Sequence, residues 1–488
     1  MICDLQSCRR SAVLARLLLL EAVVAIPCSA VASSTSAALR SQTINGPRTR
    51  RGESALLIAI APCAQDSKVA GRAPTHELEA LAEARREVQN NPESAKALFS
   101  LAVALIRLGD NDGALECLER CVRLDSSDAQ AWYLKGLMEA RKNMWVPAGQ
   151  DFRQSVKARP AFAEARIELG DMLRRTGDFD GAASELERAI ELKPQAPLAI
   201  YDLGLVQLAL GNVAEAKKDI QRAIEMQPAF PEARQSLGEI LILEHDWAGA
   251  AAAYKQVLAD RPDSLQSANG LAVALSHLGD RSLAAAAFEK AHKLSRQMIQ
   301  RQRAEIANAK ALNLWQAGDT DGAFAVFNQA LSYDPEFAEA HYSLGRLLWK
   351  LGKADEATAQ YKSALDYRPR YPEALNELGE AYLALGQTDL AVRQFRTALM
   401  VRFALAPAHL NLGRALNKQG RRDEAEEQFQ ETILLAPQNA DAHIELGLAF
   451  AQTDGALSPR ARAELAEGLR LDPSLRSLIP EQMAGQLP

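Results

Sequence analysis

Cys117 and Cys121 are the two residues of this chain whose type and spacing best fit a chemical role. Residues four apart share one face of a helix, so the two thiols could ligate one metal ion. The other four cysteines lie within the first 63 residues, and no further cysteine stands near the pair to complete a four-ligand site. Free cysteine is commonly a small buried residue, so we interpret the pair as packing residues and expect no metal site.

The histidines and the known nucleophile motifs argue against catalysis. The seven histidines are scattered, and His341, His409 and His443 occupy equivalent places in a repeat described below, which favours a packing role. The chain holds no G-x-x-x-x-G-K-[ST] phosphate loop, no G-x-S-x-G elbow and no H-E-x-x-H zinc helix. We therefore predict a protein that is not an enzyme and that binds no cofactor.

The composition indicates a folded, mainly helical protein. The 488 residues are 48% hydrophobic and 24% charged, which excludes wholesale disorder, and the abundance of Ala and Leu favours helices. The net charge of −6 argues against a general nucleic-acid-binding protein, which needs a basic surface. No apolar run long enough to cross a membrane is free of charges.

Residues 1–72 differ from the rest of the chain and resemble a targeting leader. They carry nine basic and four acidic residues, a net charge of +5, whereas the remainder carries 47 basic and 58 acidic residues, a net charge of −11. Arg9 and Arg10 precede an apolar run over 12–26 and then Ala-Val-Ala at 30–32, which is the order of a cleaved signal peptide. A second, shorter segment of the same kind follows. We predict an exported or periplasmic protein, membrane-anchored if the leader is uncleaved; the alternative is a cytoplasmic protein with a disordered tail.

The remaining sequence repeats one unit eleven times. The marker is an alanine that recurs every 34 residues, except for one step of 39 and a last step of 36. A glycine lies five residues before it in eight units, where a helix end favours glycine, and a proline that ends the next helix lies twelve residues after it in eight units. Each unit therefore predicts two helices joined by a tight turn. The marker alanines are Ala114, Ala148, Ala182, Ala216, Ala250, Ala284, Ala323, Ala357, Ala391, Ala425 and Ala461.

Small residues within each unit predict close packing of its helices. A glycine stands twelve residues before the marker alanine in seven units, and a large residue such as Phe152 or Phe395 stands four residues after it. Small residues at these places let antiparallel helices approach closely, and the large residue is expected to fill the space between units. The glycines are Gly136, Gly170, Gly204, Gly238, Gly345, Gly379 and Gly413.

This 34-residue pattern resembles the tetratricopeptide repeat (TPR) family, whose motif appears within one copy as Trp132, Gly136, Ala148, Phe152 and Pro160. The resemblance implies an all-α fold, an α-solenoid of about eleven helix–turn–helix units forming a right-handed superhelix. The predicted organisation is a leader over 1–72, an N-terminal capping helix over 77–92, copies 1–6 over 95–298, an insertion over 299–303, copies 7–11 over 304–475 and a C-terminal tail or cap over 476–488.

The junction between copies six and seven departs from the pattern. No proline or glycine occurs between Arg281 and Ala317, which predicts that the second helix of copy six runs on toward copy seven. The same segment is the one basic stretch of an acidic body, and it is either a solvated helix face or a docking site for an acidic partner. Its cations are Lys290, His292, Lys293, Arg296, Arg301 and Arg303.

The resemblance also implies a binding surface on the concave side of the solenoid, which the first helix of each copy lines in this family. The aromatic and cationic residues at lining positions are Phe99, Tyr133, Tyr201, Trp315, Tyr342, Arg346, Trp349 and Lys350. Trp315 and Trp349 are one copy apart and are expected to stack along the groove; the alternative is that several of these residues pack between copies. An extended, partly apolar and acidic segment would suit this patch.

We therefore predict a non-catalytic scaffold that binds a protein or peptide segment in its concave groove, similar to bacterial TPR scaffolds of the cell envelope. The alternative is an accessory subunit of an enzyme complex, such as one for polysaccharide synthesis or export. No nucleic acid is expected as a partner, and a membrane only through the leader. Arrays that belong to glycosyltransferases carry a ladder of asparagines, and here one of eleven equivalent positions is asparagine. No copy holds the Lys and Asn pair of a chaperone-binding clamp.

Overall fold

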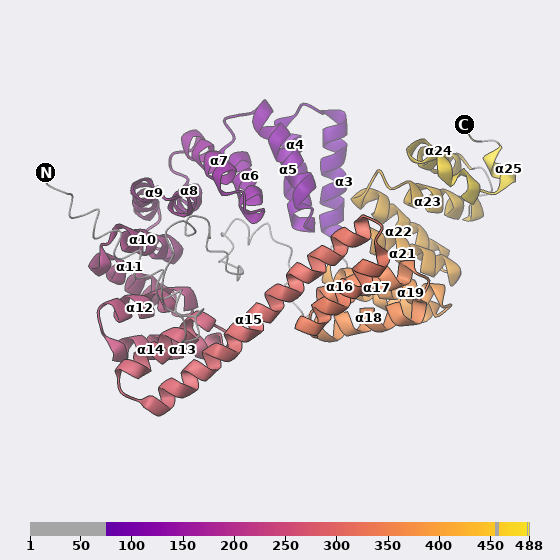
Figure 1. The fold of residues 1–488 in the computed structure, drawn as a ribbon. Helices are drawn as coiled ribbons and strands as arrows, with labels where there is room; N and C mark the ends of the chain where they lie inside the picture. The colour runs from indigo at the N-terminus through magenta and orange to yellow at the C-terminus, as the bar shows by residue number, and fades with distance from the viewer. Residues whose placement is uncertain (1–74, 454–457, 486, 488) are drawn as a thin grey trace. The chain divides into compact units, whose positions relative to one another are not determined.

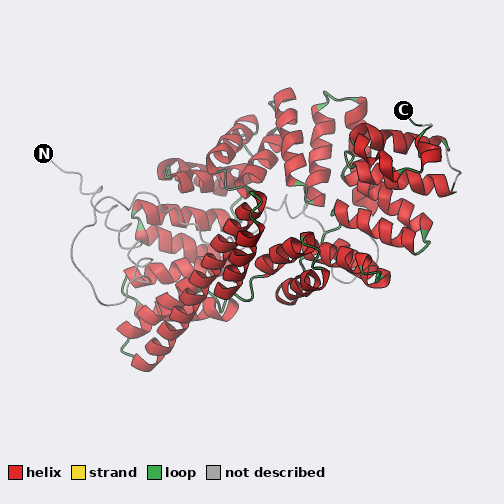
Figure 2. Ribbon diagram, turned by 45° about the vertical axis from the view of Figure 1, so that its right-hand side comes forward, coloured by secondary structure: helices red, strands yellow, loops and turns green. Residues whose placement is uncertain are grey.

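The computed structural model describes residues 75–453, 458–485 and 487, and within these residues the fold is all-helical (Figures 1 and 2). Consecutive helices pack against one another along the chain. The predicted leader over 1–72 lies outside the described residues. In the described part, no helix is both long and apolar enough to cross a bilayer. The chain divides into two compact units, one built on Asn111–Gln297 and the other on Met298–Pro488.

Most copies form two helices of 13 or 14 residues each. The helices before the unit boundary are α3 (Thr75–Asn90), α4 (Ala95–Leu108), α5 (Asn111–Leu124), α6 (Ala129–Arg141), α7 (Trp145–Ala158), α8 (Ala163–Thr176), α9 (Phe179–Leu192), α10 (Pro197–Leu210), α11 (Val213–Met226), α12 (Pro231–Leu243), α13 (Trp247–Asp260) and α14 (Leu265–His277). The boundary lies inside α15 (Arg281–Gln316). The later helices are α16 (Thr320–Tyr333), α17 (Ala338–Lys350), α18 (Ala354–Tyr367), α19 (Pro372–Ala384), α20 (Thr388–Val401), α21 (Ala406–Lys418), α22 (Arg422–Leu435), α23 (Ala440–Thr453), α24 (Pro459–Leu471), the 3₁₀ helix η1 (Pro473–Leu478) and α25 (Glu481–Ala484).

The turn between the two helices of a copy requires a left-handed residue. All eight glycines found five residues before the marker alanine have positive φ, from 76° to 89°. Asn143 and His245 occupy the same place in copies two and five, with φ of 62° and 63°. A residue with a β-carbon is strained in this conformation, which explains why glycine dominates the position.

The first-helix glycines make room for a large side chain of their own copy. A β-carbon on Gly136 would lie 2.8 Å from the Phe152 ring, and one on Gly379 would lie 2.5 Å from the Phe395 ring. The others face Leu186 (from Gly170), Ile220 (from Gly204), Tyr254 (from Gly238), Tyr361 (from Gly345) and Phe429 (from Gly413). The marker alanines Ala148, Ala182, Ala216, Ala250, Ala357, Ala391 and Ala425 are all fully buried.

The large residue therefore packs inside its own copy, and the expectation that it fills the space between units was too simple. Tyr254 does both: its ring faces Gly238 of its own copy and Gly270 of the next, where a β-carbon would lie 2.3 Å away. The Tyr254 ring thus lies between two glycines, one on the first helix of each copy.

The long helix α15 replaces the turn between copies six and seven. It runs for 36 residues without interruption, as Figure 1 shows, because nothing from Arg281 to Gln316 breaks a helix. Ala284 and Ala287 near its start belong to the core of copies five and six. Ala304 and Ala311 belong to the cores of copies seven and eight. The five residues 299–303 form no element of their own and lie inside this helix.

The C-terminal residues cover the last helix pair. Ile479, Met483 and Leu487 are buried and pack with Ile444 and Leu465 of copy eleven. A terminal copy has one face with no neighbour, and these residues bury part of it.

Candidate binding surface

An aromatic and cationic patch forms where the end of α15 meets α17. Tyr342, Arg346 and Lys350 are spaced by four residues, so they share one face of α17. The Arg346 guanidinium carbon lies 5.6 Å from the centroid of the Trp315 ring, and the Lys350 ammonium nitrogen lies 5.9 Å from the same centroid. Two cations thus lie over one indole ring, which attracts them through its quadrupole.

The aromatic residues of this patch are both packed and accessible. Trp315, Tyr342 and Trp349 are half-buried at the margin of a core that contains Phe327 and Leu348, whereas Arg346 and Lys350 are exposed. Trp315 and Trp349 pack against the same core, and the prediction that they line a groove together stays a prediction. The aromatic rings of the patch pack against the core, and the side chains of Arg346 and Lys350 are exposed to solvent.

The neighbouring helix α19 makes the adjoining surface acidic. Burial raises the pKa of Glu377 to about 7, and the nearby Glu380 carboxylate adds a smaller contribution in the same direction. The Arg346 guanidinium opposes that shift. Glu380 accepts hydrogen bonds from the amide nitrogens of Asn376, at 3.1 Å, and of Asn411. The cations on copy eight therefore border the carboxyl groups of Glu377 and Glu380 on copy nine.

The predicted groove residues of the first half differ from one another in exposure. Phe99 is half-buried, whereas Tyr133 is fully buried and Tyr201 is 7% exposed. The Tyr133 ring centroid lies 4.9 Å from that of Phe162, and the Tyr201 ring centroid lies 4.8 Å from that of Phe230. In both pairs the second aromatic residue is 29 positions later in the chain. The expectation that Tyr133 and Tyr201 present their rings to a ligand is thereby corrected: the structure gives them the alternative role of packing between copies.

Models of the tetratricopeptide repeat match most of the described chain. The matched residues are 95–138, 170–211, 201–244, 244–298, 314–363, 342–408 and 410–475. The chain belongs to the TPR family. Its architecture of consecutive helix pairs is that of a TPR solenoid, a fold of protein-interaction scaffolds.

Solved TPR structures resemble parts of the chain. MamA from Desulfovibrio magneticus is 21% identical, with a TM-score of 0.32, and the match covers 35% of this chain and 96% of that one. YrrB, described as a TPR protein with an unusual peptide-binding site, is 22% identical, with a TM-score of 0.35 and coverage of 38% and 97%. PilF of Pseudomonas aeruginosa is 18% identical, with a TM-score of 0.37 and coverage of 44% and 93%. No curated protein sequence matches the chain.

The fourth residue of a TPR unit has a role that sequence reasoning missed. The Nε2 atoms of His341, His409 and His443 lie 2.9, 2.8 and 3.0 Å from the carbonyl oxygen six residues earlier. A carbonyl only accepts, so Nε2 carries the proton and donates it. In other copies Trp132, Arg166 and Arg234 make the same bond to Ser126, Pro160 and Pro228. An N–H donor at this place therefore fastens the loop before each of these first helices.

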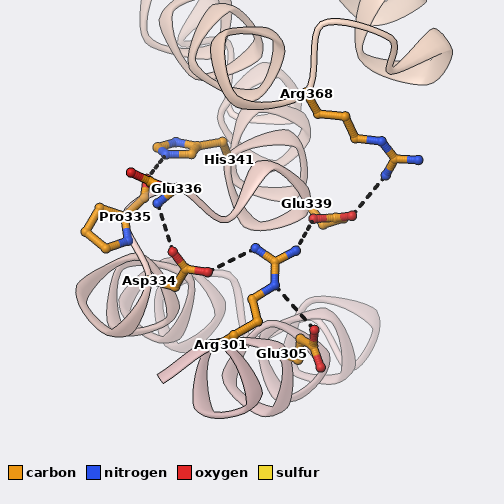
Figure 3. Close-up of polar contacts among 8 residues, drawn as sticks. All are labelled: Arg301, Glu305, Asp334, Pro335, Glu336, Glu339, His341 and Arg368. Carbon is orange, nitrogen blue, oxygen red and sulfur yellow. Dashed lines mark hydrogen bonds and ion pairs between the residues drawn. The ribbon is translucent and has the colours of Figure 1, made fainter. Parts of the chain in front are cut away.

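The basic stretch near the junction is partly used inside the chain (Figure 3). Arg301 bonds Glu305 at 3.3 Å, Asp334 at 3.0 Å and Glu339 at 3.1 Å, and its guanidinium carbon lies 4.0 Å from the centroid of Phe337. This one cation thus ties α15 to the loop before α17 and to α17 itself. Arg301 serves the fold and leaves the set of candidate docking cations.

The cysteine pair lies within the first TPR unit. Cys121 is fully buried, and its Sγ lies 3.3 Å from the carbonyl oxygen of Ala95. Burial, and after it the nearby Asp128, raises the pKa of the Cys121 thiol to about 11. Among the described residues no group of three or more His, Cys, Asp or Glu is placed to hold a metal ion.

Proposed function

We propose that this TPR protein is a non-catalytic scaffold that binds an extended segment of a partner protein across the first helices of copies seven to nine. The observation that carries the proposal is the pair of exposed cations, Arg346 and Lys350, held over the Trp315 ring. Aromatic residues and arginine supply most of the energy at protein interfaces, because they offer large contact areas and strong directional bonds.

The order of charges along the surface sets the direction of the segment. Arg346 and Lys350 on copy eight favour an acidic residue of the partner, whereas Glu380 on copy nine repels one. An apolar side chain of the segment would lie against Trp315 on copy seven or Trp349 on copy eight, whose rings are half-buried. The partner segment therefore combines an apolar residue with an acidic residue over copy eight and a polar or basic residue over copy nine.

The test is site-specific photo-crosslinking in the native host. A photoreactive residue replaces Lys350 on α17 in one variant and the exposed Asp366 on the second helix of the same copy in the control. We expect a discrete cross-linked protein from position 350 and none from position 366. Equal cross-linking from both positions, or none from position 350, would contradict the proposal.

Trp349→Ala then separates binding from folding. Loss of an interface anchor costs about 2 kcal/mol or more in affinity for the cross-linked partner, with little change in melting temperature. If the variant instead melts earlier while its affinity per folded molecule is unchanged, Trp349 is a packing residue and the groove assignment fails.

A further inference from the structure

Copy two contains a buried cluster of three charged side chains, called here the copy-two cluster. Lys135 and Glu139 lie on α6, and Asp151 lies on α7. The Lys135 ammonium nitrogen lies 2.8 Å from the Glu139 carboxylate and 2.7 Å from that of Asp151. Glu139 and Asp151 are each 5% exposed. The residues 34 and 68 positions after Lys135 are Leu169 and Leu203, so the next two copies lack this lysine.

The copy-two cluster does not balance its charges when all three groups are ionised. Two carboxylates and one ammonium leave one negative charge in a place where an uncompensated charge is costly. The Oε2 atom of Glu139 is buried and has no hydrogen-bond partner in the described chain. A single proton on one carboxyl group would make the cluster neutral and would give that group a donor for the other.

The neighbouring helices supply no second cation to the copy-two cluster. α6 packs against α5, and α7 packs against α8. The cations of α5 and α8 are Arg120, Arg123, Arg166, Arg174 and Arg175, and their acids are Asp112, Glu116, Glu119, Glu164, Glu168 and Asp171. Among the described residues, none of these forms an ion pair with Glu139 or Asp151, and neither do Arg141, Arg153 or Lys157 on α6 and α7.

The pKa of Asp151 agrees with this deficit of positive charge. Burial raises the pKa of Asp151 to about 7, the Lys135 ammonium opposes the rise, and the Glu139 carboxyl group adds to it. An aspartate in an unfolded chain has a pKa of about 4. Between these two values, folded copy two therefore holds a proton that the unfolded chain releases.

We propose that the copy-two cluster is a pH-sensitive switch, which binds one proton and thereby holds α6 against α7. When the proton is lost, one ammonium faces two carboxylates, and the α6–α7 pair opens more often. Copy one packs on copy two through α5 and α6, so its attachment should weaken together with this pair. The inference is independent of the proposed binding surface, because that surface lies on copies seven to nine.

The sign of the pH effect follows from linkage between proton binding and folding. Because the pKa of Asp151 is raised in the folded state, the stability of copy two is greatest below about pH 4, the unfolded value. It falls as pH rises toward about 7 and stays low above that value. Within this window each pH unit should increase the open fraction of copy two by up to about tenfold.

The test is hydrogen exchange of α6 and α7 in the full-length protein between pH 5 and pH 8. The measured rates are corrected for the intrinsic pH dependence of amide exchange, so that they report the open fraction of each helix. We expect the open fraction of both helices to rise with pH up to about 7 and to level off above it. Because exchange is assigned to individual helices, a titration elsewhere in the chain does not imitate this result.

Three variants of the copy-two cluster identify the proton-binding group. Asp151→Asn imitates the protonated carboxyl group, so it should remove the pH dependence and keep the low-pH protection at pH 8. Glu139→Gln leaves one carboxylate for Lys135 and should remove most of the pH dependence. Lys135→Met leaves two carboxylates without a cation, so it should raise the open fraction at pH 8 about tenfold or more. Asp180→Asn, at an exposed aspartate of α9, is the control and should behave like the unaltered protein.

Two results would overturn the proposal. One is protection of α6 and α7 that stays constant from pH 5 to pH 8 or increases with pH. The other is an unchanged pH dependence in both Asp151→Asn and Glu139→Gln, because a group outside the copy-two cluster would then bind the proton.

Discussion

Gly136→Ala tests whether the first-helix glycines are required by packing. The added β-carbon would lie 2.8, 3.0 and 3.1 Å from three carbons of the Phe152 ring, closer than carbon atoms normally approach. Phe152 is fully buried and contacts Tyr133, so the ring has little room to move away. One of the two helices must shift by several tenths of an ångström.

The size of the effect follows from two opposing terms. Overpacking a core costs about 1–3 kcal/mol, and replacing glycine by alanine inside a helix gains about 1 kcal/mol. We therefore expect a net loss of about 1 kcal/mol. Copy seven shows that the methyl is compatible with the fold, because Ala311 takes this place opposite Phe327 and both are fully buried. The loss should accordingly be modest and should not prevent folding.

Gly149→Ala is the matched control in the same copy. Gly149 lies inside α7, and a β-carbon there would meet the Met172 β-carbon at 3.4 Å, close to ordinary contact. This variant keeps the helix-propensity gain of up to about 1 kcal/mol with little steric cost. The two variants should therefore differ by about 2 kcal/mol, although both make the same chemical change.

The measurement is urea unfolding of the full chain, with hydrogen exchange of α6 and α7 to report the local change, since each repeat contacts mainly its neighbours. Adding Phe152→Leu to Gly136→Ala removes part of the crowding, so the double variant should be more stable than the sum of the two single effects predicts. A Gly136→Ala protein as stable as Gly149→Ala would refute the packing argument.

Three further predictions concern pH, the helix turn and the leader. The Glu464 carboxylate accepts a hydrogen bond from His443 and raises the pKa of that histidine. The stabilisation from this bond is therefore complete below about pH 6.5 and is lost as pH rises through the raised pKa. Urea unfolding over this range should show that copy eleven becomes less stable as pH rises, and His443→Gln should remove the pH dependence. His245→Gly should stabilise the chain by about 1 kcal/mol in thermal unfolding, because φ of 63° strains histidine and not glycine; a lower melting temperature would mean that the contact of His245 with Trp247 outweighs the strain. N-terminal sequencing of the native protein should begin after Ala32 or near Ala64, and intact Met1 in a soluble cytoplasmic fraction would end the export hypothesis.

The helix pairs were predictable because their determinants are local. The glycine of each turn adopts a left-handed conformation that few other residues tolerate, so its spacing marks the turns directly. The exposure of a groove residue depends instead on the next copy. Tyr133 is covered by Phe162 and Tyr201 by Phe230, whereas position 128, the equivalent place for Phe99, is aspartate. An aromatic residue 29 positions later thus indicates a ring that packs between copies, and it also indicates Tyr342, whose ring centroid lies 5.0 Å from that of Tyr371.

The loop bond of the fourth residue escaped prediction for a different reason. Histidine, arginine and tryptophan all make it, because each places an N–H donor near the carbonyl six residues earlier. A sequence comparison of residue types sees three unrelated side chains at this position. The shared property is a hydrogen bond to the backbone carbonyl six residues earlier, which is visible only in the structure.

The regular TPR contacts determine where binding can occur. Within each copy the glycine, the marker alanine and the large residue are committed to packing, and the fourth residue is often committed to the loop. Several exposed cations of the second unit are engaged by carboxylates, as Arg368 is by Glu339. Arg346 and Lys350 lie over the Trp315 ring, at the end of the irregular helix α15, and belong to none of these packing contacts. The candidate surface is therefore composed of side chains that the packing of the repeats does not use.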